Sequence, residues 1–313
     1  MTQEQRPEIS IVTPVYNEEA LAAEFYVQIT DVLSRANVNY ELVFVDDGSC
    51  DRSVEILQEC RRDLGGNARI VRLARNFGHQ IAITAGQRYA SGRAVVVMDC
   101  DLQDPPKVVL EFIQKWKEGF DVVYGVRSER RGESLFKRAT ARLFYWILRL
   151  TAHVDIPSNV GDFYLLDRKV VDVLNKMNEH HRFIRGLVAW MGFKRFGVSY
   201  IREPRFAGET KYNFWRMLKF SFDALTSFSF ALLRMISFLG ALMFFLAFFG
   251  IGMIFYLKLF TDRTVLGWSS LMVVVLFIGG IQLLAIGVIG EYLARIGDDV
   301  KARPLYTVQE VLE

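Results

Sequence analysis

Acidic residues crowd together at the end of one apolar run. The segment VVVMDCDLQDPP, residues 95–106, places Asp99, Asp101 and Asp104 directly after a stretch typical of a strand buried on both faces. Two unneutralised carboxylates about 4 Å apart repel by roughly 4 kcal/mol at an effective dielectric constant near 20. The D-x-D spacing lets two of these acids reach one hard divalent cation, which also bridges to phosphates. We therefore predict a Mg²⁺ or Mn²⁺ site here, with a solvated acidic turn as the alternative.

Two further polar clusters follow apolar runs in the same way. Asp46 and Asp47 precede a Gly-Ser pair that suits a tight turn into a helix. A carboxylate there can accept from a base N–H or a ribose hydroxyl, although capping of the next helix explains this pair equally well when it is taken alone. The segment TPVYNEE, residues 13–19, is typical of a helix N-cap at Asn17 followed by acids matched to the helix dipole.

The N-terminal part of the chain alternates apolar runs with stretches of helical length. Strands are predicted at residues 8–15, 40–47, 68–74, 93–99 and 120–126, and a further strand and helix within residues 158–174. Continuous β-branched runs separated by helical stretches are typical of parallel strands with crossover helices. We predict an α/β fold with a doubly wound, mostly parallel sheet whose carboxyl edge gathers the three polar clusters.

The chain of 313 residues is 51% hydrophobic but also 23% charged, and its apolar excess is concentrated near the C-terminus. Residues 236–257 and 264–290 carry no charge, and the first run of about 22 residues would span roughly 33 Å as a helix. We predict a hairpin of two transmembrane helices, with buried helices of a soluble bundle as the alternative. Basic residues are more frequent outside the hairpin than in its loop, which predicts that both termini are cytoplasmic.

Residues 211–233 precede the first apolar run and mix aromatic side chains with Lys and Arg at helical spacing. This pattern favours helices lying in the membrane interface, and a core-facing helix of the globular part is the alternative. The predicted organisation is a catalytic domain of residues 1–204, interfacial helices of residues 205–233, a hairpin of residues 234–292 and a cytoplasmic tail of residues 293–313.

Several classes of protein receive no support from the sequence. The net charge of +3 does not by itself indicate a nucleic-acid partner, and three cysteines without C-x-x-C spacing indicate neither a disulfide framework nor a zinc site. The phosphate-binding G-x-x-x-x-G-K-[ST] and the G-x-G-x-x-G of dehydrogenases are missing, as is G-x-S-x-G. We expect His180 and His181 to form a surface pair, and His79 to pack or cap a helix rather than catalyse.

Taken together and in order, several segments resemble family 2 glycosyltransferases of the GT-A fold. They are TPVYNE, VDDGSCD, RNFGHQIAITAG, VVVMDCDLQDPP, the stretch from Gly125 to Arg127, GDFYLLDRKVV, RFAGETKY, and GEYLARI with KARPLY. Within that family the chain is similar to the polyprenyl-phosphate glycosyltransferases, a group that includes dolichol-phosphate mannose synthases and bactoprenol glucosyl- and aminoarabinosyltransferases. The resemblance covers nearly the whole chain, including both apolar runs.

The resemblance implies roles for individual residues. Donor-binding residues would be Pro14, Tyr16, Glu18, Asp46, Asp47, Asp99 and Gln103. Ligands of the divalent metal would be Asp99, Asp101 and Gln103. Residues binding the acceptor phosphate would be Arg127, Arg131 and Arg138. From their place beside the predicted membrane segments, Arg205 and Lys211 could also guide the lipid phosphate, or instead bind anionic headgroups. The catalytic residues would be Asp162 and Arg127.

The expected reaction is transfer of one hexose, glucose from UDP-glucose, to undecaprenyl phosphate with inversion, in a membrane-bound homo-oligomer, for which we expect a tetramer. The Q-x-x-R-W string of processive sugar synthases is missing, since Arg185 and Trp190 stand further apart, and this argues for a single transfer. Alternatives are another donor of the GDP-mannose or UDP-aminoarabinose type, a membrane-anchored nucleotidyltransferase, or a membrane-tethered sensor without catalysis.

Overall fold

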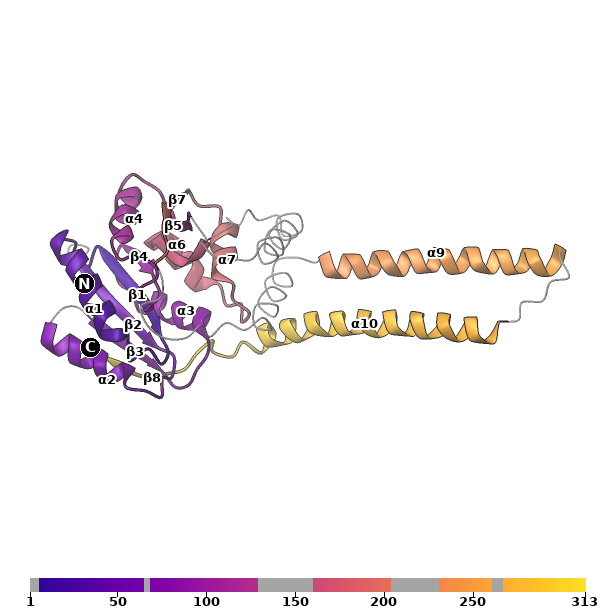
Figure 1. Ribbon diagram of the computed structural model, residues 1–313, viewed down its shortest axis with the longest axis horizontal. Helices are drawn as coiled ribbons and strands as arrows, with labels where there is room; N and C mark the ends of the chain where they lie inside the picture. The colour runs from indigo at the N-terminus through magenta and orange to yellow at the C-terminus, as the bar shows by residue number, and fades with distance from the viewer. Residues whose placement is uncertain (1–5, 65–67, 129–159, 204–230, 261–266) are drawn as a thin grey trace.

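A single mixed sheet forms the centre of the globular part. The structure is a computed structural model that describes residues 6–64, 68–128, 160–203, 231–260 and 267–313. Its strands are ordered β7-β5-β6-β4-β1-β2-β3-β8 (Figure 1). Their bounds are β1 Ile9–Val15, β2 Tyr40–Asp46, β3 Ala68–Leu73, β4 Ala94–Val97, β5 Val122–Arg127, β6 Val160–Asp167, β7 Arg195–Tyr200 and β8 Val308–Leu312.

The first four strands confirm the parallel arrangement expected from the sequence. β1 pairs in parallel with both β2 and β4, and β2 pairs in parallel with β3. The connecting helices are α1 Ala22–Arg35, α2 Ser53–Leu64 and α3 His79–Tyr89, and α4 Val108–Lys117 follows β4. Side chains of α1 and α4 pack in the core on one face of the sheet, whereas α3 packs on the other, so both faces are covered.

The other half of the sheet differs from a simple parallel continuation. β6 lies between β4 and β5 and is antiparallel to both, while β7 pairs in parallel with β5. The sequence predicted a mostly parallel sheet and did not assign the order of these strands. The apolar run of β6 is equally suited to either direction, since it is buried along most of its length and hydrophobic pattern does not encode strand direction. Helices α6 Arg168–Lys176 and α7 Ile184–Trp190 cover the same face as α3.

The last residues of the chain belong to the sheet. β8 pairs antiparallel with β3 at the edge, with Val311 opposite Val71. The segment of residues 293–313, expected as a separate tail, therefore contains the end of α10 and an edge strand. α10 stops at Lys301 because Ala302 adopts φ 47°, in the left-handed region, and a proline follows shortly after it.

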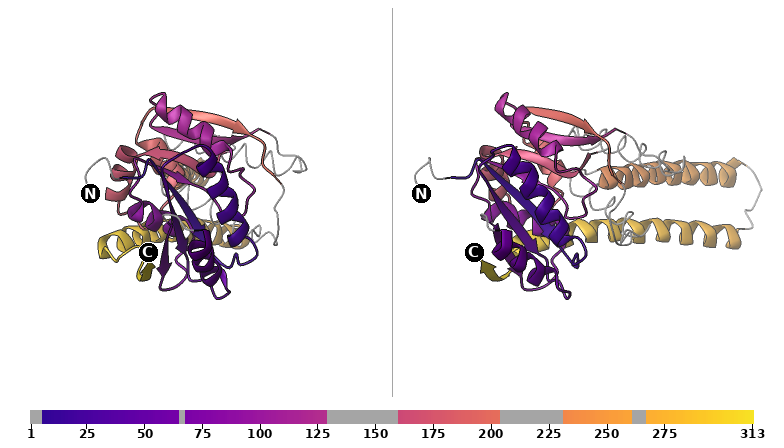
Figure 2. Two further views of the ribbon diagram at one scale, coloured as in Figure 1. Left: turned by 90° about the vertical axis from the view of Figure 1, so that its left-hand side faces the viewer. Right: turned by 60° about the vertical axis from the view of Figure 1, so that its left-hand side comes forward.

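Two long helices project from the globular part. They are α9 Ala231–Phe260 and α10 Trp268–Lys301, which run side by side (Figures 1 and 2). Among the described residues, one stretch, Phe277–Lys301 with mean hydropathy 1.7, is long and apolar enough to cross a bilayer. α9 contains the shorter apolar stretch Phe238–Gly250, so the second span stays a prediction. Residues 205–230 of the expected interfacial segment lie outside the described residues.

Candidate active site

The carboxyl ends of β1, β2 and β4 bring the predicted polar clusters to one edge. Val15, directly after Pro14, is paired with Asp46, and the backbone N–H of Asp47 donates to the Val15 carbonyl at 2.9 Å. On the other side of β1, the N–H of Met98 donates to the carbonyl of Val12 at 3.1 Å. Pro14 and Asp46 therefore lie at the carboxyl ends of β1 and β2, and Asp99 follows the end of β4 by two residues, at one edge of the sheet as the sequence predicted.

The loop after β1 is fastened to the loop after β2. The N–H of Asn17 donates to Ser49 Oγ at 3.0 Å, and its side-chain oxygen accepts from the N–H of Cys50 at 2.9 Å. The N–H of Glu18 donates to Ser53 Oγ at 2.9 Å. The expected N-cap at Asn17 is wrong, because α1 begins five residues later at Ala22 and Asn17 instead adopts φ 52°.

The neighbouring Tyr16 is 39% exposed on this loop. A partly exposed aromatic ring at a strand end can stack on a flat ligand such as a base. The donor role that the family resemblance implies for Tyr16 stays a prediction.

The two acids of the VDDGS segment point in different directions. Asp46 is fully buried, accepts from the N–H of Ser49 at 3.0 Å and lies 3.5 Å from Arg72 Nε. Asp47 accepts from the N–H groups of Phe77 and Gly78 at 2.7 and 2.9 Å, so it holds the turn that starts α3. Burial raises the pKa of Asp47, against these two hydrogen bonds. Asp47 thus has a structural role in addition to its predicted contact with the donor.

The acids after β4 form a compact cluster. Asp101 accepts from the N–H of Gln103 at 3.2 Å, across Leu102 with φ 56°. The N–H of Glu203 donates to the carbonyl of Gln103 at 2.9 Å, so the loop after β7 lies against this cluster. Burial raises the pKa of Asp99 to about 6, and the charges of Asp101 and other acids add to that effect while His79 opposes it.

Arginine side chains approach the acidic cluster from β5 and from the loop after β7. Arg202 lies 3.8 Å from Asp101 and 3.6 Å from Asp104, and Arg127 Nη2 lies 3.9 Å from Asp104. The hydroxyl of Tyr200 donates to Asp104 and accepts from Arg127 Nε at 3.3 Å. The predicted phosphate-binding Arg127 therefore lies beside Asp104, the last acid of the cluster.

The acidic cluster suits a divalent cation that also coordinates substrate phosphates. Asp99 Oδ1 is buried and accepts no hydrogen bond in the described part of the chain. The described residues contain no group of three or more His, Cys, Asp or Glu side chains arranged around a common metal position. Mg²⁺ is commonly held by one or two carboxylates together with waters and substrate phosphates, which is what two acids and one amide can provide. The donor set therefore fits such a cation.

Asp162 of β6 is the other ionic centre of the site. Its side chain is 8% exposed and its Oδ1 accepts from Arg185 Nε at 2.9 Å. Its Oδ2 accepts from Gln80 Nε2 at 2.9 Å and lies 3.2 Å from His79 Nε2. Burial opposes ionisation, but the charge of Arg185 and the bond from His79 hold the pKa of Asp162 well below its usual range. The carboxylate is therefore ionised throughout the neutral range.

His79 links the two ionic centres. Its Nε2 lies 3.6 Å from Asp99 Oδ1 as well as 3.2 Å from Asp162. Burial lowers the pKa of His79, but the charges of Asp99 and Asp162 outweigh it and raise the pKa to about 9. The sequence predicted that His79 packs or caps a helix rather than catalyses, and it did not anticipate that the ring lies between two site carboxylates. The signal that could have found it is its position just after a strand, at the same sheet edge as the acids.

Arg127 reaches the same region from the end of β5. Its guanidinium lies over Gly161, the residue before Asp162, and a Cβ added at Gly161 would collide with Arg127 Nη2. The structure thus places Arg127 against the residue that precedes Asp162 on β6. The predicted residues Arg131, Arg138, Arg205 and Lys211 lie outside the described residues.

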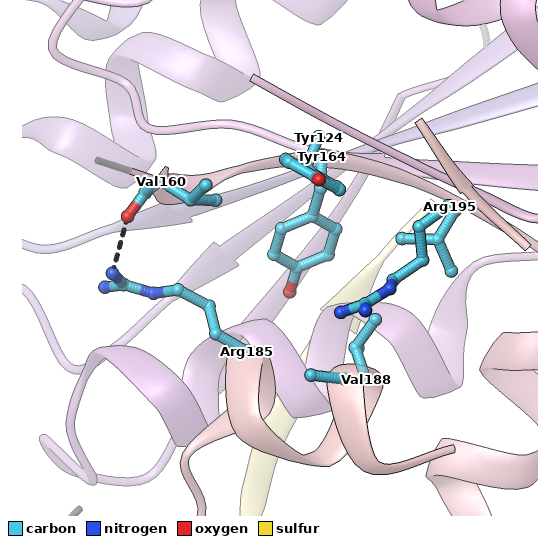
Figure 3. Close-up of a pocket in the computed structure, with 8 residues that line it drawn as sticks. Tyr124, Val160, Tyr164, Arg185, Val188 and Arg195 are labelled. Carbon is cyan, nitrogen blue, oxygen red and sulfur yellow. Dashed lines mark hydrogen bonds between the residues drawn. The ribbon is translucent and has the colours of Figure 1, made fainter. Parts of the chain in front are cut away.

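A small cavity lies behind Arg185, between α7 and the sheet (Figure 3). Its lining residues are Val122, Tyr124, Val160, Tyr164, Arg185, Val188, Ala189 and Arg195. With a volume of about 30 Å³ it has room for little more than one water molecule. This cavity is too small for a sugar.

The surface histidines contact the end of α10. His180 bonds to Asp299 and to the carbonyl of Arg303 through its ring, and His181 Nε2 lies 3.4 Å from Asp298. Both rings contact carboxylates at the surface, as expected of a surface pair. The pair joins the α6–α7 loop to the base of the apolar helix.

Comparison with known proteins shows which family the chain resembles. Residues 10–174 match the family Glycosyl transferase family 2. The glycosyltransferase YkcC of Bacillus subtilis (strain 168), named uncharacterized, is 52% identical over 301 residues, covering 96% of this chain and 93% of the relative. A prophage bactoprenol glucosyl transferase homolog of Escherichia coli (strain K12) is 38% identical over 306 residues, covering 97% and 99%.

Among solved structures, the mannosyltransferase PcManGT from Pyrobaculum calidifontis, in complex with GDP-Man and Mn²⁺, has a TM-score of 0.49 at 19% identity, covering 68% of this chain and 61% of that chain. The family match spans more than half of the sequence, and the relatives align along nearly all of it. The chain therefore belongs to glycosyl transferase family 2 and is a glycosyltransferase similar to the bactoprenol glucosyl transferases.

Proposed function

We propose that the protein transfers one glucose from UDP-glucose to undecaprenyl phosphate, with inversion, at the cytoplasmic face of a membrane. The observation that carries this proposal is that α10 continues into β8 of the catalytic sheet. A helix apolar enough to cross a bilayer and the acidic strand ends thus belong to one folded unit. Such a unit suits a water-soluble donor and an acceptor whose tail stays in the bilayer. Relatives named bactoprenol glucosyl transferase support this choice of sugar and lipid.

Asp99, Asp101 and Gln103 would hold Mg²⁺ or Mn²⁺ together with the donor diphosphate. When bound, the cation would supply positive charge to the departing nucleoside diphosphate. The buried Oδ1 of Asp99 and the raised pKa of this acid are what a carboxylate awaiting a cation would show. Tyr16, Glu18 and the buried Asp46 would bind the nucleoside, with Pro14 and Asp47 shaping the loops around it.

The acceptor phosphate would bind near Arg127, with Arg131, Arg138, Arg205 and Lys211 as further candidates. A phosphate monoester has a second pKa near 6, so at neutral pH the acceptor is already a dianion and needs no strong base. Asp162 is a weak base because its pKa is held low, so we assign it an orienting role beside the reaction centre. One direct displacement by the lipid phosphate inverts the configuration at the sugar carbon.

The membrane assignment follows the same proposal. Residues 1–204 would form the catalytic domain, residues 205–233 would lie in the interface, and residues 234–292 would cross the membrane twice. Residues 293–313 would return to the cytoplasm, where β8 completes the sheet. A homo-oligomer, with a tetramer as the expected form, is also part of this proposal.

The test is a panel of nucleotide sugars incubated with full-length enzyme, undecaprenyl phosphate and Mg²⁺. UDP-glucose should give a chloroform-soluble glucolipid with release of UDP, and chelation with EDTA should stop its formation. GDP-mannose and UDP-aminoarabinose test the alternative donors. Release of pyrophosphate in place of a nucleoside diphosphate would instead identify a nucleotidyltransferase and overturn the proposal.

A further inference from the structure

Asp162 is held by donors from two different helices. Gln80 comes from the first turn of α3, and Arg185 comes from the first turn of α7. We infer that Gln80 and Arg185 are positioning residues that fix the orientation of the Asp162 carboxylate for sugar transfer. This inference rests on the proposed function, in which Asp162 faces the reaction centre.

Arg185 holds both the side chain and the backbone of β6. Its Nε donates to Asp162 Oδ1 at 2.9 Å, and its Nη1 donates to the carbonyl of Val160 at 2.7 Å (Figure 3). Val160 is two residues before Asp162 on the same strand. A planar guanidinium that makes both bonds fixes the carboxylate relative to its own backbone, and the single ammonium of a lysine cannot reproduce this fork.

Gln80 closes a ring of hydrogen bonds around the same carboxylate. Its Nε2 donates to Asp162 Oδ2 at 2.9 Å, and its Oε1 accepts from the N–H of Ile184 at 3.1 Å. Ile184 precedes Arg185, so the amide also sets where α7 begins. The orientation of the Gln80 amide is unambiguous, because an ionised carboxylate only accepts and a backbone N–H only donates.

Both oxygens of Asp162 are held by donors. Arg185 binds Oδ1 through Nε at 2.9 Å and Oδ2 through Nη2 at 3.4 Å, and Gln80 also binds Oδ2, with His79 close to it. The carboxylate cannot rotate without breaking bonds to two helices. Catalysis depends steeply on such placement, since a shift of about 1 Å at a reacting group can cost roughly 10²-fold in rate.

If Gln80 and Arg185 had only a structural role, they would hold α7 against the sheet and have no effect on catalysis. Its loss would lower thermal stability and reduce the amount of folded enzyme, and kcat per folded molecule would stay the same. A positioning pair predicts the opposite pattern, in which kcat falls and the KM values for donor and acceptor change little. The two interpretations therefore separate in kinetics normalised to folded protein.

The test compares full-length Arg185→Met, Arg185→Lys and Gln80→Met with matched controls on α1. The controls are Arg35→Met, which removes a 2.7 Å ion pair to Asp31, and Gln28→Met, which removes a 2.8 Å bond to Glu24. Each is assayed with whichever nucleotide sugar of the panel the wild type uses. We expect kcat to fall about 10²-fold in Arg185→Met, about tenfold in Gln80→Met, and less in Arg185→Lys, with wild-type values in both controls.

Chemical rescue provides the second measurement. In Arg185→Ala, millimolar guanidinium should restore part of kcat, and an equal concentration of NaCl should not. Wild-type kcat in Arg185→Met, or a loss of kcat in Arg185→Ala that guanidinium does not restore, would overturn the inference and leave the proposed function standing. A wild-type enzyme that forms no glycolipid with any donor of the panel would overturn the proposed function, and this inference with it.

Discussion

The Nε atom of Arg72 lies 3.5 Å from Oδ2 of Asp46, a carboxylate that is fully buried at the end of β2. The same guanidinium donates from Nη1 to Glu310 of β8 at 3.1 Å. Arg72 therefore connects a predicted donor-binding residue to the strand that follows the apolar helix. The C-terminal strand and the predicted donor site therefore both contact the guanidinium of Arg72.

Replacing Glu310 and replacing Arg72 itself should have unequal effects. Glu310→Gln removes an exposed ion pair and should lower the free energy of unfolding by about 0.2–1 kcal/mol at most. Arg72→Met leaves the buried Asp46 without its nearby charge and should cost more, up to about 3 kcal/mol, with a higher KM for the nucleotide sugar. Thermal unfolding and donor kinetics on the full-length protein check this. Equal destabilisation by both variants would contradict it.

The sequence predicted the sheet edge that carries the acidic residues, because the end of each strand can be located from the residues around it. The apolar runs before Asp46 and Asp99 identify their strands, and parallel topology then brings their ends together. The same argument could not find Arg185, since its partner Asp162 is 23 positions away on an antiparallel strand. No local pattern records that pairing, which depends on where β6 enters the sheet.

The direction of β6 and the position of β8 at the edge of the sheet also could not be predicted from local sequence patterns. β6 is buried along most of its length, so its hydrophobic residues do not distinguish a parallel from an antiparallel neighbour. β8 is a short, half-exposed strand, and its place beside β3 is set by pairing over more than 200 positions of the chain. Both features arise from tertiary packing, which propensity and periodicity do not encode.

The raised pKa of His79 predicts a pH-dependent contribution to stability. Its pKa of about 9 in the folded protein lies above the ordinary value of 6.5. The imidazolium therefore stabilises the fold fully below about pH 6.5, and this contribution disappears as the pH rises through 9. In EDTA, the difference in Tm between wild type and His79→Gln should shrink from pH 6.5 to 9.5. A difference that grows over this window would contradict the assignment.

Gly161 should control the position of Arg127. A methyl group at this residue collides with the far end of the Arg127 side chain, which can swing away at little cost to the fold. Gly161→Ala should therefore keep its Tm but lower kcat/KM for the lipid phosphate about tenfold, the value of one charge-assisted hydrogen bond. Gly240→Ala is the control, since an added Cβ there meets nothing within 4 Å. Unchanged acceptor kinetics in Gly161→Ala would argue against Arg127 as a phosphate ligand.

Asp101 should couple donor binding to the divalent cation. Asp101→Asn keeps a side-chain oxygen that can accept from Gln103 but removes the charge, so the cation loses one of its two predicted carboxylates. Transfer should fall by about 10²–10³-fold. In calorimetry with UDP, the affinity gained by adding Mn²⁺ should also largely disappear. Asp31→Asn on α1 tests for a general effect of removing one acid and should behave as wild type. Wild-type Mn²⁺ dependence in Asp101→Asn would place the cation elsewhere.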